Sequence, residues 1–387
     1  MHETQEHREL RATVRRFVEA EIDPHVAEWD KAGGFPAHEL FAKMGDLGLL
    51  GISKPTAFGG LGLDYSYEIA FSEEIGGAHC AGVPLAIGVQ SNMATPALAR
   101  HGSDDLRAEF LAPAIAGRAV AAIAVSEPHA GSDVAAIRTT AREVGDDYII
   151  DGSKMWITNA GFADFFCVLA NTGGTSRHHD KSLIIVPRGT PGVSVGAPLE
   201  KMGMRASNTA PVFFDNVRVP CRHRIGEAGK GFIYQMQQFQ EERLFGAAMA
   251  VKALELCVSS TVAQTRERRA FGQSVLDNQI VHFQLAEMQT EIEALRALLY
   301  RATATYVAGE NVTVLASMAK LKAGRLCRSL PDKCLQFWGG MGFVEETIIN
   351  RLYRDLRLVP IGGGADEVMQ GILCKLMGMA PGKEVKP

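Results

Sequence analysis

The spacing of apolar residues changes twice along this chain, and this change restricts the fold more than any other feature. Over residues 6–118 apolar side chains such as Leu10 and Val14 recur at three- and four-residue steps, which predicts amphipathic helices. Over residues 119–219 short β-branched and aromatic runs alternate with turn residues, which predicts strands. Helical spacing returns at Phe232. We therefore expect a fold of the α+β class.

A chain of 387 residues is too long for one simple core. We expect three domains: an N-terminal helical domain at 1–119, a middle β domain at 120–230 and a C-terminal helical domain at 231–387. In the last of these, one apolar face runs through 281–299, and a second begins with Leu315, Met318, Ala319 and Lys322. A four-helix bundle is the economical way to bury such faces.

Three local signals refine this picture. The first helix should stop before Pro24, because the residue that precedes a proline avoids helical geometry. Asp151-Gly152 follows the strand-like run 148–150 and predicts a hairpin turn. His178-His179 lie in a polar loop at 171–181 but lack a third ligand, so we expect no metal site.

Composition narrows the class of function. The formal net charge is −4 and charges of both signs are mixed along the chain, so no surface for nucleic acid or for an anionic membrane is expected. No window approaches ~18 uncharged apolar residues, and the N-terminus lacks the apolar core of a signal peptide, so we expect no membrane span. The seven scattered cysteines form no CxxC pair and indicate reduced thiols in a cytoplasmic protein.

Two stretches of the β segment have the composition of a ligand-binding loop. An apolar run that ends at Val125 leads into residues 126–133 (SEPHAGSD), and residues 154–159 (KMWITN) follow roughly one hairpin later. The small residues leave backbone N–H groups reachable, and Ser126 and Ser132 add hydroxyls to the same turn. An ordinary loop at the end of a strand has a similar composition, so the first stretch alone does not distinguish a ligand-binding loop from such a loop.

Together these two stretches resemble the acyl-CoA dehydrogenase family of flavoproteins. The resemblance continues along nearly the whole chain through residues 201–205 (KMGMR), 268–273 (RRAFGQ), 336–342 (QFWGGMG) and 354–355 (RD). Each motif alone is weak evidence for the resemblance, but six motifs in this order are strong evidence for it. The resemblance implies an N-terminal helical domain, a middle β domain and a C-terminal four-helix bundle. It also implies an FAD-dependent oxidoreductase that converts an acyl-CoA thioester to the trans-2-enoyl-CoA.

The resemblance further implies how FAD is held. In the middle domain the implied cofactor residues are Val125, Ser126, Gly131, Ser132, Trp156, Ile157 and Thr158. In the C-terminal domain they are Arg268, Phe271, Gln279, Gln336, Phe337, Gly339, Gly340, Ala365 and Glu367. Of these, Arg268, Phe271 and residues 336–340 would reach the FAD of a neighbouring subunit, and an arginine fork suits a pyrophosphate. The chain would then be a homo-oligomer, typically a tetramer built as a dimer of dimers, that passes electrons to an electron-transfer flavoprotein.

Oxidation of a thioester between its α and β carbons needs a base for the α proton and donors aimed at the carbonyl oxygen. In many family members the base is a Glu in a turn near the C-terminus, where this chain has Gly363. A branch that includes the isovaleryl- and long-chain-acyl-CoA enzymes places it on a helix before an Arg, which here matches Glu242 before Arg243. Adjacent helical residues point about 100° apart, so Glu241 and Glu242 cannot both face a flavin. Periodicity does not choose between them, whereas the resemblance selects Glu242.

The implied substrate-binding residues are Ser132, Arg243, Gly363 and Gly246. The Gly363 N–H would bind the thioester carbonyl, which requires close approach of the backbone. Gly246 lies one turn beyond Glu242, and its missing side chain would leave room for an acyl chain. His129 stands where the family pattern has Gly, so a positive φ at this residue would be strained.

Within the family, residues 234–246, 315–325 and 361–369 are most similar to citronellyl-CoA dehydrogenases of acyclic terpenoid breakdown. This favours a branched or medium-to-long acyl chain. Two enzymatic alternatives stay open, namely an acyl-CoA oxidase and a dehydrogenase of acyl groups bound to a carrier protein. A third alternative belongs to another class, a flavin-free relative that acts as a binding or assembly subunit.

Overall fold

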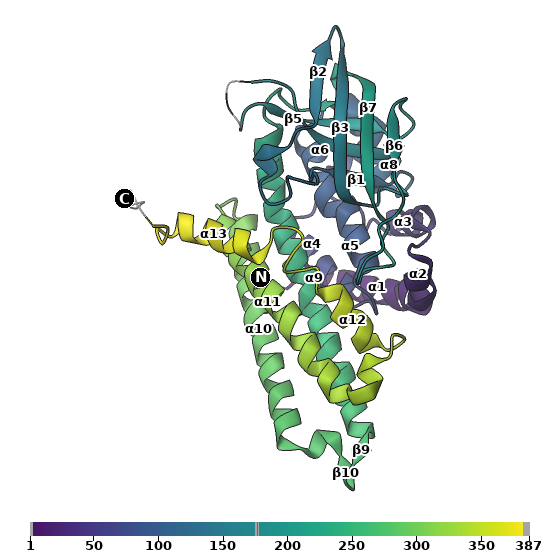
Figure 1. Ribbon diagram of the computed structural model, residues 1–387, viewed down its shortest axis with the longest axis vertical. Helices are drawn as coiled ribbons and strands as arrows, with labels where there is room; N and C mark the ends of the chain where they lie inside the picture. The colour runs from purple at the N-terminus through teal and green to yellow at the C-terminus, as the bar shows by residue number, and fades with distance from the viewer. Residues whose placement is uncertain (1–2, 175, 177, 382–387) are drawn as a thin grey trace.

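The computed structural model describes residues 3–174, 176 and 178–381, and it confirms the α+β architecture that the sequence predicts. The N-terminal helices lie beside the β domain, and the long C-terminal helices extend away from it as a bundle (Figure 1). The β domain forms one end of the elongated molecule. The small hairpin of β9 (Arg269–Ala270) and β10 (Gln273–Ser274) forms the other end (Figure 1).

The N-terminal part is helical, as expected. Its helices are α1 (Gln5–Phe17), α2 (Val26–Ala32), α3 (Ala37–Asp46), α4 (Tyr65–Ile75), α5 (Gly82–Gly88), α6 (Pro96–His101), α7 (Asp104–Leu106) and α8 (Ala112–Ile115). α1 begins after Thr4, whose side chain accepts a hydrogen bond from His7 N. A π-helical turn at Val18–Ile22 and a 3-10 turn at Asp23–His25 carry the chain past Pro24.

The β domain is one mixed sheet. Its strands are β1 (Ala121–Ala124), β2 (Thr140–Val144), β3 (Asp147–Thr158), β4 (Phe165–Asn171), β5 (Lys181–Pro187), β6 (Val193–Val195), β7 (Thr209–Pro220) and β8 (Arg224–Ile225). The order across the sheet is β6-β7-β3-β2-β4-β5-β8, and β1 pairs in parallel with β4. β4 and β5 are buried along nearly their whole length, because their two faces belong to two separate apolar clusters.

Gly152 does not lie in the predicted hairpin turn. β3 continues through Asp151 and Gly152, and it pairs with β7 on both sides of them. The register shifts between Ile150 and Gly152, which marks a β-bulge. A Cβ on Gly152 would lie 2.5 Å from Thr139 Oγ1, and its φ is 149°, so both close approach and backbone conformation require glycine. The turn between β2 and β3 lies instead at Gly145, where φ is 63°.

The C-terminal part consists of α9 (Gly231–Glu267), α10 (Gln279–Val307), α11 (Thr313–Trp338), α12 (Ile348–Leu356) and α13 (Asp366–Leu376). α9 packs against α10 and α11, and also against α4 and β5, so all three parts of the chain meet along it. Among the described residues α9 is long and apolar enough to cross a membrane, but 61% of its most apolar window is buried inside the molecule. A core helix has the same property, so the absence of a membrane span stays a prediction.

The buried face of α11 differs from the expectation. Among its four predicted residues only Ala319 is buried, whereas Leu315, Met318 and Lys322 are partly exposed. Lys322 lies near the surface, where its side chain is 34% exposed and pairs with Glu291. The buried face is formed by Ala316, Ala319, Lys320 and Ala323, which follow one another at helical steps. The buried lysine of this helix is therefore Lys320.

Two of the six motifs join the domains to one another. Asp355 of the 354–355 motif is fully buried and accepts hydrogen bonds from Ala81 N of the N-terminal domain and Met204 N of the middle domain. The adjacent Arg354 Nη1 donates to Met202 O at 3.2 Å. Burial raises the pKa of Asp355 to about 6, and its two backbone donors oppose this rise. These motifs place the three domains relative to one another.

Candidate active site

A buried ion pair holds the 126–133 loop against β3. Lys154 and Glu127 are 0% and 2% exposed, and Lys154 Nζ lies 2.9 Å from Glu127 Oε1. The same ammonium donates to Val125 O at 2.9 Å. Burial lowers the pKa of Lys154 to about 8, and Glu127 opposes that change. The two middle-domain motifs are thus fastened to each other in the interior.

The Glu127 carboxylate also fixes the chain that follows the loop. It accepts hydrogen bonds from Arg138 N at 2.6 Å and from Thr139 N at 2.9 Å. His129 Nε2 lies 3.4 Å from its second oxygen. His129 is not among the residues with positive φ, so its place in the loop carries no backbone strain.

The residues around this loop fit a flat, polar cofactor such as a flavin. Trp156 is 53% exposed and has a φ of 60°, so an aromatic ring stands open beside the loop. Ser132 and Gly131 are exposed, and a Cβ on Gly131 would meet nothing within 4 Å. Ser126 and Thr158 are partly exposed. In contrast, the side chains of Val125 and Ile157 are buried in the core, so these two residues offer a cofactor only their backbone.

Apart from Ala365 and Glu367, the predicted C-terminal cofactor residues lie near the other end of the molecule. Arg268 Nη1 donates to Phe337 O at 3.2 Å, and Gly339, with a φ of 60°, lies against the same guanidinium. Gln336, Gly340 and Gln279 are exposed. Phe271 has a relative exposure of 106%, so its whole ring lies in solvent. The fit to a pyrophosphate is good, since an arginine lies beside an open glycine turn.

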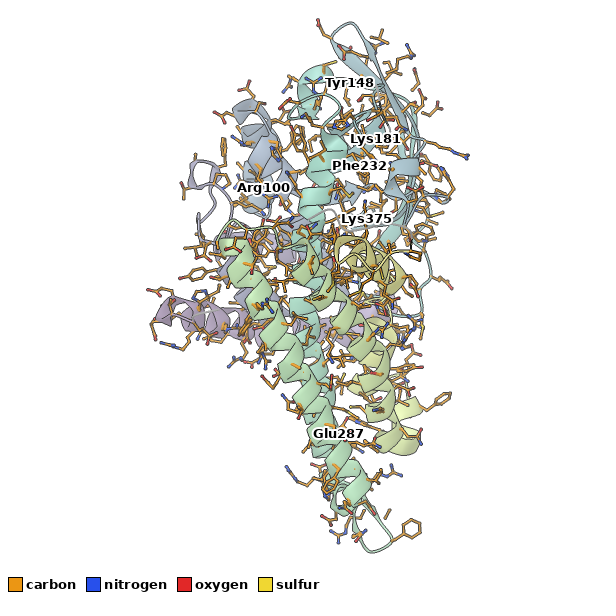
Figure 2. All side chains as sticks on the ribbon, turned by 90° about the vertical axis from the view of Figure 1, so that its left-hand side faces the viewer. Arg100, Tyr148, Lys181, Phe232, Glu287 and Lys375 are labelled. Atoms are coloured by element: carbon orange, nitrogen blue, oxygen red, sulfur yellow. The ribbon has the colours of Figure 1, made fainter. Side chains whose placement is uncertain are left out.

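One chain does not bring the two cofactor sets together. The hairpin that carries Phe271 lies at the opposite end of the molecule from the β domain (Figure 1). Figure 2 shows the same separation, with Tyr148 and Lys181 in the β domain and Glu287 far down the bundle. Ala365 and Glu367 belong to neither end, since Ala365 caps α13 and Glu367 lies exposed in its first turn. A cofactor that contacts both sets must therefore lie between two chains.

The structure brings Glu242 to the turn where the family's other base position lies. Glu242 is on α9 and half-buried, and its Oε1 is 3.1 Å from the place where a Cβ of Gly363 would stand. Gly363 has a φ of 62°, and within the described residues its N–H has no acceptor. Burial raises the pKa of Glu242, while the positive charges of Lys320 and Arg243 oppose this. A carboxylate of this kind suits a base that acts near neutral pH.

Glu241 and Arg243 take other positions on α9. Glu241 is 4% exposed and accepts hydrogen bonds from Arg100 Nη2 and, at 2.5 Å, from Tyr306 OH. Its Oε1 is therefore occupied by partners from α6 and α10. Arg243 is buried, donates to Gln240 Oε1 at 3.2 Å, and has a pKa lowered by burial. Its contact with a substrate stays a prediction.

The sequence analysis did not predict one residue of this site. Lys320 of α11 is 3% exposed, and its Nζ donates to Val359 O at 2.6 Å and to Gly364 O at 3.1 Å. Its Cε lies 3.6 Å from the Cβ positions of both Gly246 and Gly363. The space beside Gly246 is thus shared with a lysine stem. The sequence feature that could have identified Lys320 is its position on the same helical face as three small residues.

Comparison with known proteins gives a consistent picture. The family models Acyl-CoA dehydrogenase, N-terminal, middle and C-terminal domain match residues 4–118, 122–217 and 229–377. The mitochondrial long-chain specific acyl-CoA dehydrogenase of Sus scrofa is 38% identical over 96% of this chain and 86% of its own length. The mitochondrial short-chain specific acyl-CoA dehydrogenase of Rattus norvegicus is 34% identical over 95% of this chain and 89% of its own.

The three-dimensional structure also matches that of a solved relative. The crystal structure of a probable acyl CoA dehydrogenase from Mycobacterium abscessus superposes with a TM-score of 0.93 at 37% identity, and the match covers 97% of this chain and 99% of that one. Three domain models in order and relatives matched along almost their whole length lead to one conclusion. The chain belongs to the acyl-CoA dehydrogenase family of FAD-dependent oxidoreductases.

Proposed function

We propose that this protein oxidises a branched or medium-to-long acyl-CoA, similar to citronellyl-CoA, to the trans-2-enoyl-CoA, with Glu242 as the base for the α proton. The observation that carries the base assignment is the position of Glu242. It is a half-buried carboxylate against the Gly363 turn, and its pKa is raised. Glu241 does not compete, because Arg100 and Tyr306 already occupy its carboxylate.

In this proposal the residues of the site divide three tasks, and Ser132 contacts both FAD and the substrate. Glu242 accepts the α proton, and the unpaired N–H of Gly363 donates to the thioester carbonyl, where negative charge builds up. Ser126, Ser132, Trp156 and Thr158 hold FAD beside the loop. Bound FAD supplies the acceptor for the hydride that leaves the β carbon. Arg243 and Ser132 contact the substrate.

The choice of acyl chain rests on the resemblance to citronellyl-CoA dehydrogenases and on the absent side chain of Gly246. The names of the relatives leave chain length open, since one is long-chain specific and another short-chain specific. Anaerobic bleaching of the bound flavin by short straight, long straight, isovaleryl- and citronellyl-CoA tests the proposal. Rapid bleaching selective for the long branched thioester is expected. A flavin that no thioester bleaches would favour carrier-bound substrates, and a protein that binds no FAD would favour a binding or assembly subunit.

Gly246→Leu should exclude the long branched chain. The new side chain would occupy the space between α9 and the Lys320 stem, where a Cβ already lies 3.6 Å from Lys320 Cε. Because one methylene more or less in an apolar pocket changes kcat/KM about 10- to 200-fold, we expect at least a loss of this order for citronellyl-CoA. A short straight acyl-CoA, measured on the same preparation, should keep its kcat/KM. Equal losses for both substrates would show that the acyl chain lies elsewhere.

We also propose a cytoplasmic homotetramer, arranged as a dimer of dimers, that shares its FAD sites between subunits and passes electrons to an electron-transfer flavoprotein. Support for the shared site comes from Phe271, which is fully exposed at the end of the molecule away from the β domain. The seven free thiols support a reducing compartment. Sedimentation of the FAD-loaded protein tests the assembly, and a monomer that keeps its FAD would contradict it.

A further inference from the structure

Lys320 is a buried charge that no motif identifies. Its ammonium lies among backbone carbonyls, with Val359 O at 2.6 Å and Gly364 O at 3.1 Å. Both acceptors belong to the segment between α12 and α13 that contains Gly363. A buried ammonium is unfavourable unless hydrogen bonds and opposite charges compensate it. Lys320 therefore fastens the Gly363 segment to α11.

The charges that face Lys320 come from each element packed around it. Glu242 of α9 is the strongest source of attraction, and Asp366 at the start of α13 is the second. Arg243 of α9 repels the ammonium. The Cys327 thiol, which is on α11 like Lys320, is the remaining titratable group that faces it. Within the described residues Asp366 Oδ1 is buried without a hydrogen-bond partner, 2.5 Å from the place where a Cβ of Gly324 would stand. Burial lowers the pKa of Lys320 to about 8, so the group still carries its charge at neutral pH.

Lys320 and Glu242 are also linked sterically. The Lys320 Cε lies 3.6 Å from the Cβ position of Gly363, and Glu242 Oε1 lies 3.1 Å from the same point. The base, the turn and the lysine stem thus meet at one place. A side chain on Gly363 would crowd Glu242 and would also contact Lys320. The geometry makes the position of the turn relative to the base depend on Lys320.

We infer that Lys320 is a positioning residue for α-proton abstraction, which holds the Gly363 N–H beside Glu242 through two carbonyl contacts and favours the ionised form of Glu242 through its charge. This inference rests on the proposed function, because it takes Glu242 as the base. The two roles are separable by substitution. Lys320→Met keeps the stem but removes donors and charge, whereas Lys320→Gln keeps donors and removes the charge.

The test is anaerobic flavin reduction by a saturating acyl-CoA as a function of pH, in FAD-loaded wild-type protein and in the two variants. Loss of the positive charge disfavours ionised Glu242, so in both variants the acidic limb of the profile should move to higher pH. In Lys320→Met the plateau rate should also fall about 10- to 100-fold, since a displaced turn misplaces the thioester. Lys320→Gln should keep more of the plateau rate than Lys320→Met.

A second readout does not depend on activity. Labelling of Glu242 by a water-soluble carbodiimide, which reacts with the protonated carboxyl, can be followed by mass spectrometry across pH. In both variants labelling should persist to higher pH than in wild type, and Glu242→Gln gives the background. Lys322→Met is the matched control, because Lys322 lies two residues away near the surface and pairs with Glu291. It should leave both profiles unchanged.

Profiles that coincide with wild type in both variants would overturn the inference. A lower plateau without any shift of the acidic limb would overturn the charge role. If Lys320→Met does not fold, Lys320→Gln alone decides the charge role. Full activity of Glu242→Gln would refute the proposed function. An inactive Glu242→Gln together with lysine variants that behave like wild type would refute only the inference about Lys320.

Discussion

Replacing Glu242 by Gln should lower the rate of flavin reduction by an acyl-CoA about 10²- to 10⁴-fold, the range by which a positioned base accelerates proton transfer. The amide has the size of the carboxylate but cannot accept the α proton. Within the described residues the Glu242 side chain makes no hydrogen bond, so the amide breaks none. Stopped-flow absorbance under anaerobic conditions measures the rate, and the flavin spectrum measures FAD content, which should not change.

Glu241→Gln is the control on the adjacent residue. Its catalytic rate should stay close to wild type, because its carboxylate faces Arg100 and Tyr306. Its stability should fall by about 1–3 kcal/mol, since a charge-assisted hydrogen bond in the interior is weakened. Rates are therefore compared at a temperature where both variants are folded. Full activity of Glu242→Gln, or a loss confined to Glu241→Gln, would refute the base assignment.

Lys154→Met should destabilise the protein by about 3–5 kcal/mol and weaken FAD binding, because it leaves Glu127 buried without its counter-charge. The ammonium also holds Val125 O, so the 126–133 loop loses its anchor to β3. Urea denaturation measures the change in the free energy of unfolding. Titration of the apoprotein with FAD, followed by flavin fluorescence, measures the affinity.

The control for Lys154→Met is Lys43→Met. Lys43 forms its ion pair with Glu21 at the surface, where its side chain is 57% exposed. Such a pair contributes at most about 1 kcal/mol, so the urea midpoint and the FAD affinity should barely move. If Lys154→Met behaves like this control, the buried ion pair does not organise the loop.

The sequence predicted the order of the domains because periodicity is a local property. The face through 281–299 and the strand runs of the middle domain appear in the structure as α10, β4 and β5. Local patterns gave a wrong prediction where a side chain distant in the sequence determines the backbone geometry. Asp151-Gly152 has the composition of a hairpin turn, but Thr139 occupies the space beside Gly152 and makes it a bulge. The same composition serves both geometries, because each needs a residue without a Cβ.

The sequence by itself determined the family, the set of motifs and the residue types that proton abstraction requires, since these depend on which residues occur and in what order. Only the tertiary structure decided which groups each of the two neighbouring carboxylates meets. Glu241 is held by Arg100 and Tyr306 from two other helices, whereas Glu242 meets Gly363 and Lys320. Periodicity cannot foresee such pairs, because a helix fixes the direction of a side chain but not what the folded chain brings to face it.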